Sequence, residues 1–228
     1  MSELHKIYNQ PLAPEAVRRV FDLLGVGESR PAERFRVLDF GCGGGRYLEA
    51  LATRIPMENL VGADVEAVQL ERVRAKGFQA VQLDPDKGEL PFESESFDAV
   101  FSSNVVEHIP RPLYLAYLRE IARVLKAGGR FLVGTPNYPM KRVYDVRQAA
   151  RTGHWRYYLF DDPTHCNRLG FRSLERDLSE WFSEIRLDPT YIFFERSIPL
   201  LRRPAVRRRL RFLSNKIFGY CVKPAAAA

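Results

Sequence analysis

The chain has 228 residues, of which 46% are hydrophobic and 28% are charged, and its formal net charge at pH 7 is +7. This length suffices for one domain with a sizeable core, or for one domain with appendages. No stretch approaches the ~20 apolar residues that a membrane span needs, and no charged leader with an apolar core opens the chain. We therefore expect a cytoplasmic protein rather than a secreted or membrane-spanning one.

The positive charge is concentrated near the end of the sequence. The segment from Arg196 to Lys223 contains nine basic residues and no acidic one. The rest of the chain is therefore nearly neutral, and the basic segment needs its own explanation.

The cysteines and histidines predict neither disulfide nor metal chemistry. Cys42, Cys166 and Cys221 are widely spaced and form no C-x-x-C pair, which favours reduced, structural thiols. The four histidines lack the spacing of metal ligands. The sequence thus predicts no metal site.

In chain order, the first predicted element is a helix over residues 14–25, with proline near its start and glycine at its end. Helices and strands then alternate, which predicts an α/β fold with helices on both faces of a mostly parallel sheet. The predicted strands lie at 35–40, 60–64, 79–83, 97–102 and 129–135, and the predicted helices between them lie at 45–54, 66–76 and 112–126. Ligands of such sheets bind beyond the carboxyl ends of the strands.

A glycine-rich turn follows the first of these strands. Glycines at 41, 43 and 45 allow positive φ angles and a close approach of the backbone to a ligand. The helix that begins at Arg46 directs its first amides toward negative charge. Asp64 ends the next strand, where a carboxylate can accept hydrogen bonds from both hydroxyls of a ribose. Together the turn and the later acid predict a site for a nucleotide-type cofactor.

The pattern distinguishes between two classes of cofactor. A dinucleotide fingerprint requires a third glycine where this chain has Arg46, so a dehydrogenase is disfavoured. The run Asp39-x-Gly41-x-Gly43-x-Gly45 instead resembles motif I of the class I S-adenosylmethionine-dependent methyltransferases. The small-molecule, type 11-like branch of that family is also similar in the segments 90–92, 96–101, 104–109 and 126–133, so the resemblance covers roughly residues 35–136.

The resemblance implies a Rossmann-like three-layer sandwich with a seven-stranded, mostly parallel sheet whose last strand is antiparallel. The closing helix is then expected at 172–183 and the closing hairpin at 184–188 and 190–196. The expected methyltransferase domain spans 1–196. It includes an N-terminal helical cap (1–30) and an aromatic insertion (137–170), which we interpret as a lid over the substrate or, alternatively, as a helical excursion covering the sheet edge.

The resemblance also implies roles for individual residues around S-adenosylmethionine, which is converted to S-adenosylhomocysteine. Asp39, Gly41, Cys42, Gly43 and Arg46 would surround its methionine half. Asp64 and Val65 would hold the ribose. Either Asp84 or Asp86 would accept a hydrogen bond from the adenine amino group. The backbone of Asn104 would lie beside the methyl-bearing sulfur.

Two histidines are candidates for a general base. His108 follows the fourth strand, and His165 lies where related enzymes bring a lid residue to the acceptor; a neutral imidazole accepts a hydroxyl proton near pH 7. Tyr157 and Tyr158 are lesser candidates for substrate contact.

The sequence favours oxygen methylation of a small-molecule or lipid- or glycan-linked acceptor. Residues 102–105 read Ser-Ser-Asn-Val rather than the Asn/Asp-Pro-Pro-aromatic run of enzymes that methylate amino groups of adenine or glutamine. The alternatives are an RNA-binding methyltransferase-like protein that uses its basic segment on phosphates and a non-catalytic cofactor-binding partner.

Residues 197–228 are interpreted as a basic amphipathic tail. Pro204 can begin a helix with Val206, Leu210, Leu213 and Ile217 on one face and basic residues elsewhere. Such helices lie on anionic membrane surfaces, so residues 197–223 suggest peripheral contact with the inner membrane face. The alternative to membrane contact is a helix that packs on the domain and leaves its arginines in solvent.

Overall fold

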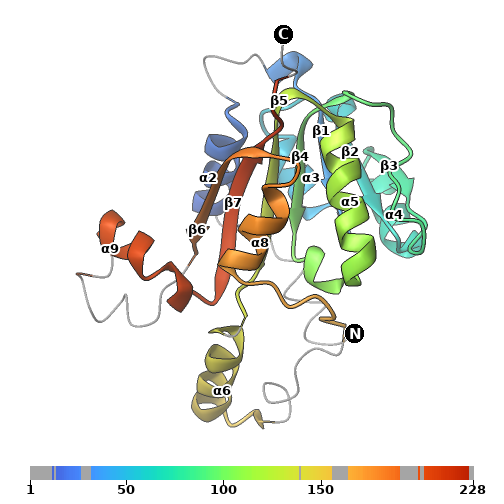
Figure 1. The fold of residues 1–228 in the computed structure, drawn as a ribbon. Coiled ribbons are helices and arrows are strands. Elements are labelled where there is room, and N and C mark those ends of the chain that lie inside the picture. Colours follow the sequence, from blue (N-terminus) through green and yellow to red (C-terminus); the bar gives the residue numbers. More distant parts are fainter. Residues whose placement is uncertain are drawn as a thin grey trace.

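A seven-stranded sheet forms the centre of the molecule in the computed structural model, which describes residues 12, 14–26, 32–138, 140–155, 164–190, 200 and 203–225. The strand order is β3-β2-β1-β4-β5-β7-β6 (Figure 1). The strands are β1 (Val37–Phe40), β2 (Leu60–Asp64), β3 (Gln79–Gln82), β4 (Phe97–Ser103), β5 (Leu125–Pro136), β6 (Ser183–Pro189) and β7 (Lys216–Val222). β1 to β5 are parallel, whereas β7 runs antiparallel to both β5 and β6. The predicted mostly parallel sheet with an antiparallel last strand is confirmed.

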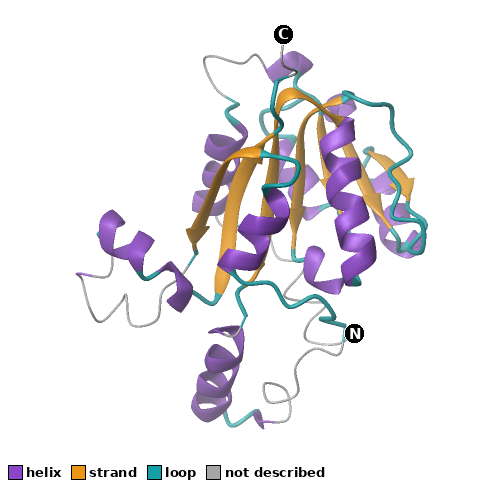
Figure 2. Cartoon of the chain, viewed as in Figure 1, coloured by secondary structure: helices purple, strands orange, loops and turns teal. Residues whose placement is uncertain are grey.

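Helices cover both faces of this sheet (Figure 2). One face is packed by α2 (Pro14–Leu24), α3 (Arg46–Leu51) and α4 (Ala67–Ala75), and the other by α5 (Arg111–Val124) and α8 (Phe171–Leu178). Short 3-10 turns occur at Ala32–Arg34, Met57–Asn59, Val106–His108 and Arg211–Leu213. The three-layer architecture expected from the resemblance is therefore present.

Sequence periodicity explains this layering. In α5, Tyr114, Leu118 and Ile121 recur at helical spacing and are at most 1% exposed. In β5, Phe131 and its neighbour Leu132 point to opposite faces and belong to the two different core clusters. Each fully buried side chain of this size contributes about 1.5–3 kcal/mol of transfer free energy.

The insertion at 137–170 begins with helix α6 (Met140–Thr152), which projects beyond the carboxyl edge of the parallel strands (Figure 1). Its start is fixed by the buried Asn137, whose Nδ2 donates to the carbonyls of Ser214 at 2.6 Å and Phe212 at 3.0 Å. Tyr157 and Tyr158 lie outside the described residues. The lid role of the insertion stays a prediction.

The predicted boundary at residue 196 is corrected by β7. Residues 216–222, assigned to the tail from the sequence, lie between β5 and β6 and complete the sheet. Ile217, Gly219 and Cys221 are buried at every second position, which is typical of a strand. The arginine run before them made this short pattern hard to recognise in the sequence. The strand expected at 190–196 lies, apart from its first residue, outside the described part of the chain.

The tail helix is shorter than predicted. α9 (Pro204–Arg209) begins at Pro204 as expected but ends five residues later, and Ile217 lies in β7 rather than on its apolar face. Arg207 donates to the carbonyl of Pro189 at 2.8 Å, and Arg211 pairs with Glu175 at 2.9 Å. This segment is thus partly packed on the domain. None of the helices that the structure describes is long and apolar enough to cross a bilayer.

Candidate functional site

A cavity of about 650 Å³ opens at the carboxyl ends of β1, β2 and β4. It is the place that the parallel-sheet prediction gives for a ligand. The predicted site residues that line it are Gly41, Cys42, Gly43, Arg46, Asp64, Val65, Asn104 and His108. Lining residues that the sequence analysis did not single out include Tyr47, Gln69, Pro85, Ser103, Tyr117 and Thr164.

The glycine turn needs glycine for two different reasons. Gly41 has φ +77°, and a Cβ on it would overlap the side chain of Val105, so the loop after β4 packs directly on the turn. Gly43 has φ +49°, and a Cβ there would meet no atom within 4 Å. The space beside Gly43 is therefore part of the cavity and available to a ligand.

The carboxylate of Asp64 is fixed by backbone amides. Oδ2 accepts a hydrogen bond from the amide of Gly43 at 2.8 Å, and Oδ1 accepts one from the amide of Glu66 at 3.0 Å. A carboxylate has about four acceptor positions, so it can still accept from a diol. The geometry thus suits the ribose role that the resemblance implies.

Asp39 lies beneath the turn and does not line the cavity. Its side chain is 1% exposed, and within the described residues Oδ2 has no hydrogen-bond partner. Burial, and secondarily the charge of Asp64, raises the pKa of Asp39 to about 8. A positively charged ligand group in the turn would offset this penalty. This buried carboxyl, with one oxygen that lacks a hydrogen-bond partner in the described residues, therefore fits a cationic ligand.

Cys42 remains a thiol in this setting. Burial and the neighbouring Asp39 and Asp64 carboxylates raise the pKa of its thiol well above the ordinary value. Its Sγ lies 3.6 Å from the carbonyl of Gly43. A nucleophilic role is therefore disfavoured, in agreement with the structural interpretation from the sequence.

Asp84 and Asp86 are exposed and flank Pro85, which lines the cavity. Asp84 accepts from the amide of Asp86 at 3.1 Å and pairs with Lys87 at 3.2 Å, and both contacts lower the pKa of Asp84. Neither carboxylate lines the cavity. The contact of one of them with adenine therefore stays a prediction.

Asn104 has an unusual backbone conformation at the end of β4. Its φ is +57°, a region that Asn tolerates better than most residues. Its amide donates to the carbonyl of Gly134 at 2.8 Å, and its Oδ1 accepts from Nζ of Lys216 at 2.7 Å. Burial lowers the pKa of Lys216. The sequence analysis missed Lys216 because it stands in the basic segment, where its charge gave no distinct signal.

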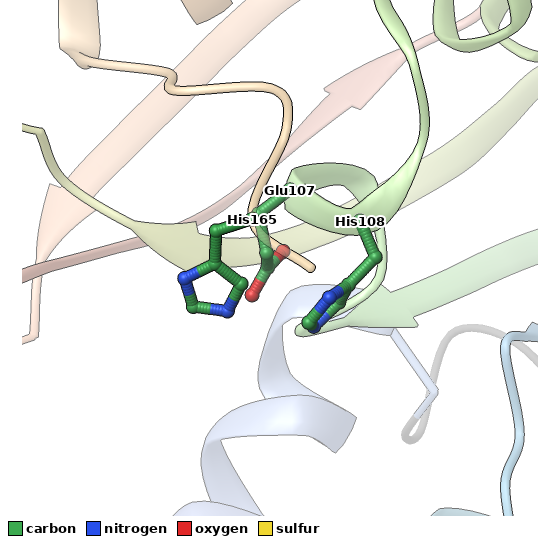
Figure 3. A group of neighbouring side chains, drawn as sticks. All are labelled: Glu107, His108 and His165. Atoms are coloured by element: carbon green, nitrogen blue, oxygen red, sulfur yellow. The ribbon is translucent and has the colours of Figure 1, made fainter. Parts of the chain in front are cut away.

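The two predicted bases lie next to each other (Figure 3). The ring centroids of His108 and His165 are 4.6 Å apart. Nδ1 of His108 lies 2.7 Å from Oγ1 of Thr164, and Nδ1 of His165 lies 2.7 Å from the hydroxyl of Tyr138. His108 and Thr164 line the cavity, whereas His165 does not.

Glu107 lies beside these two rings (Figure 3). Its side chain is 1% exposed, and Oε2 accepts from the Thr135 hydroxyl at 3.1 Å. Oε1 has no hydrogen-bond partner within the described ranges, and burial raises the pKa of this carboxyl. The sequence analysis quoted Glu107 in a motif without assigning it a role; its place beside His108 was the available signal.

Comparison with known proteins identifies the domain. Residues 38–133 match the model of the family described as a methyltransferase domain. Residues 38–133 therefore form a class I S-adenosylmethionine-dependent methyltransferase domain of the type 11 branch. Its cofactor is S-adenosylmethionine, as the resemblance implied.

Relatives of the methyltransferase domain differ in their acceptors. The chain is 34% identical over 117 residues to a ubiquinone biosynthesis O-methyltransferase of Chelativorans sp., a match covering 50% of this chain and 45% of the relative. It is 32% identical over 127 residues to a 27-O-demethylrifamycin SV methyltransferase of Amycolatopsis mediterranei, covering 53% and 45%. The chain therefore spans less than half the length of these curated relatives.

The fold of the methyltransferase domain extends beyond the matched segment. A solved S-adenosylmethionine-dependent methyltransferase from Archaeoglobus fulgidus aligns over 92% of both chains with a TM-score of 0.65 and 18% identity. At this identity the likeness concerns the fold alone.

Proposed function

We propose that the protein transfers the methyl group of S-adenosylmethionine to a hydroxyl oxygen of a small-molecule or lipid- or glycan-linked acceptor. The observation that carries the proposal is one cavity lined by two sets of residues. The first set is the glycine turn with Asp64, and the second is His108 with Thr164. Such a cavity suits a bound cofactor on one side and an acceptor on the other.

The residues have three tasks in this reaction. The bound cofactor supplies a methyl group activated by a sulfonium. The cofactor is bound and oriented by Asp39, Asp64 and the glycine turn. The cavity walls keep water from the reacting atoms. A hydroxyl acceptor must also lose its proton, and the cavity wall at His108 is the place for this step. It can accept the proton directly or hold a cation that makes the hydroxyl more acidic.

The names of two relatives support an oxygen acceptor. One is an O-methyltransferase of ubiquinone biosynthesis and the other acts in the methylation of a demethylated rifamycin. Because the alignments cover only part of those proteins, the relatives support the reaction class and leave the acceptor of this chain to experiment.

An acceptor screen with methyl-tritiated S-adenosylmethionine tests the proposal. Phenols, aliphatic polyols and lipid-linked sugars form the arms, with amines and RNA as comparison acceptors. We expect label in one of the oxygen arms and its loss in Asp64→Asn. Labelling of amines or RNA alone would overturn oxygen transfer, and tight S-adenosylhomocysteine binding with no labelled acceptor would favour a non-catalytic partner.

We also propose that the exposed basic surface of α9 contacts anionic membranes. Arg203, Arg208, Arg209 and Phe212 are exposed on neighbouring positions of this segment. A truncation at 197 is unsuitable as a test because it would remove β7. Sedimentation with phosphatidylglycerol vesicles should instead be reduced by replacing the three arginines with glutamine. Equal sedimentation of variant and parent would overturn the membrane contact, and salt-sensitive binding to RNA but not to vesicles would favour the nucleic-acid alternative.

A further inference from the structure

Three potential metal ligands meet at the edge of the cavity, although the sequence predicted no metal site. One ligand atom each from Glu107, His108 and His165 lies within 4.8 Å of the other two. The fold brings them together from the end of β4 and from the returning end of the insertion (Figure 3). We propose that this chain binds one divalent first-row transition-metal ion through these three side chains.

Glu107 provides the first supporting observation. Its carboxylate is 1% exposed, yet Oε1 lacks a hydrogen-bond partner within the part of the chain that is described. A buried carboxylate oxygen without a partner is unfavourable. A cation between the two imidazoles would bind this oxygen and balance its charge. Thr135 already holds Oε2, so the carboxylate has a fixed orientation.

The contacts of the two imidazoles provide the second observation. Each Nδ1 lies 2.7 Å from a hydroxyl oxygen, that of Thr164 for His108 and that of Tyr138 for His165. Metal-binding histidines usually hydrogen-bond through the other ring nitrogen, which fixes the tautomer and the orientation of the ring. We therefore assign Nε2 of each ring as the metal ligand.

The chemistry of the three ligands selects the class of cation. Imidazole nitrogen suits Zn²⁺, Fe²⁺ or Ni²⁺, and two imidazoles with one carboxylate typically leave coordination positions open. Bonds of about 2.1 Å bring ligand atoms to about 3.4 Å from one another. His108 is exposed and His165 is half-buried, so the two rings have room to close on a cation while Glu107 stays in place.

The cation would lie beside the acceptor, a consequence that rests on the proposed function. His108 contributes to both the cluster and the cavity. Open coordination positions would take an acceptor oxygen and lower the pKa of a bound hydroxyl. The released proton would pass to solvent, and the imidazoles would act as ligands rather than as bases.

Calorimetric titration of the full chain, stripped by a chelator, with Zn²⁺ and with Co²⁺ tests the site. We expect one equivalent per chain, with affinity at least tenfold lower in Glu107→Gln and in His165→Gln. His154→Gln is the matched control because His154 is exposed and outside the cluster, and its affinity should equal that of the parent. Tyr138→Phe, which removes only the hydroxyl beside His165, should weaken binding about tenfold.

The absorption spectrum of the Co²⁺ form adds a structural readout. Visible bands of Co²⁺ should appear in the parent and in His154→Gln and be altered or lost in His165→Gln. Thermal unfolding and S-adenosylhomocysteine affinity show whether each variant is folded. No stoichiometric binding, or equal affinity in all folded variants, would overturn the metal site and leave the methyltransferase function standing. If the parent protein itself did not bind S-adenosylhomocysteine, this result would count against the proposed function instead.

Discussion

The ammonium group of Lys216 donates a hydrogen bond to Oδ1 of Asn104 at 2.7 Å. This contact joins the first residue of β7 to the loop after β4, where Asn104 has φ +57°. Asn104 lines the cavity. The last strand of the sheet therefore helps to hold the backbone of Asn104, at the wall of the cavity, in its left-handed conformation.

Replacing Lys216 with methionine tests this link. Lys216→Met keeps most of the side-chain volume but removes the charged hydrogen bond, so we expect S-adenosylhomocysteine to bind about tenfold more weakly, within the range for such bonds. Calorimetry measures the change, and the control is Lys126→Met, which removes the ion pair of Lys126 with Asp98 near the amino end of β5. An affinity equal to that of the parent would show that Asn104 holds its conformation without Lys216.

Gly41→Ala should damage the fold. The new Cβ would overlap Val105 at a positive φ, so we expect a loss of about 1–3 kcal/mol in the free energy of unfolding. Urea unfolding measures it. Adding Val105→Ala should restore part of the loss, because that change removes the overlapping methyl groups. A double variant no more stable than Gly41→Ala would contradict the packing argument.

Gly43→Ala should affect the ligand more than the fold. Its Cβ would meet no protein atom within 4 Å, so the unfolding free energy should fall only by about 1 kcal/mol, the cost of the left-handed conformation. S-adenosylhomocysteine affinity should fall at least tenfold because the methyl group occupies the cavity. Unchanged affinity would place the ligand elsewhere.

Asp39 should make the ligand-free protein less stable as the pH rises. Its folded pKa of about 8 exceeds the ordinary value of 3.8, so the unfolded chain loses this proton first. The contribution of Asp39 to stability is therefore fully present below about pH 4 and declines up to about pH 8. Asp39→Asn should gain stability over the parent across this range in urea unfolding. If the unfolding free energies of the parent and of Asp39→Asn changed in parallel with pH, the pKa of Asp39 would not be raised. Asp22→Asn, on the exposed face of α2, is the control.

Ligand binding should release the proton of Asp39. The resemblance places the methionine half of the cofactor at the turn above this carboxyl, and its ammonium favours the ionised form. Calorimetry of S-adenosylhomocysteine at pH 7 in buffers of different ionisation enthalpy should show net proton release in the parent and less in Asp39→Asn. Equal proton release in both proteins would assign it to another group.

Local patterns in the sequence were sufficient for the first five strands and the cofactor turn. The strand ending at Phe40, the glycines after it and Asp64 carry both their structure and their chemistry within short segments. β7 was missed because an arginine run precedes it and its alternation is brief. The meeting of His108 with Thr164, 56 positions later, depends on how the insertion returns to the sheet. No local pattern predicts such a contact.

The most direct test of the account is calorimetric titration of the parent protein, Asp64→Asn and Asp22→Asn with S-adenosylhomocysteine, with NADH as the control ligand. The Asp64 carboxylate accepts hydrogen bonds from the amides of Gly43 and Glu66, so its replacement removes a fixed carboxylate to which the resemblance assigns the ribose. We predict binding of S-adenosylhomocysteine alone, retained in Asp22→Asn and weakened at least tenfold in Asp64→Asn. Folded parent protein that binds no S-adenosylhomocysteine, or binds it as tightly with Asn at position 64, would contradict the assignment of this site.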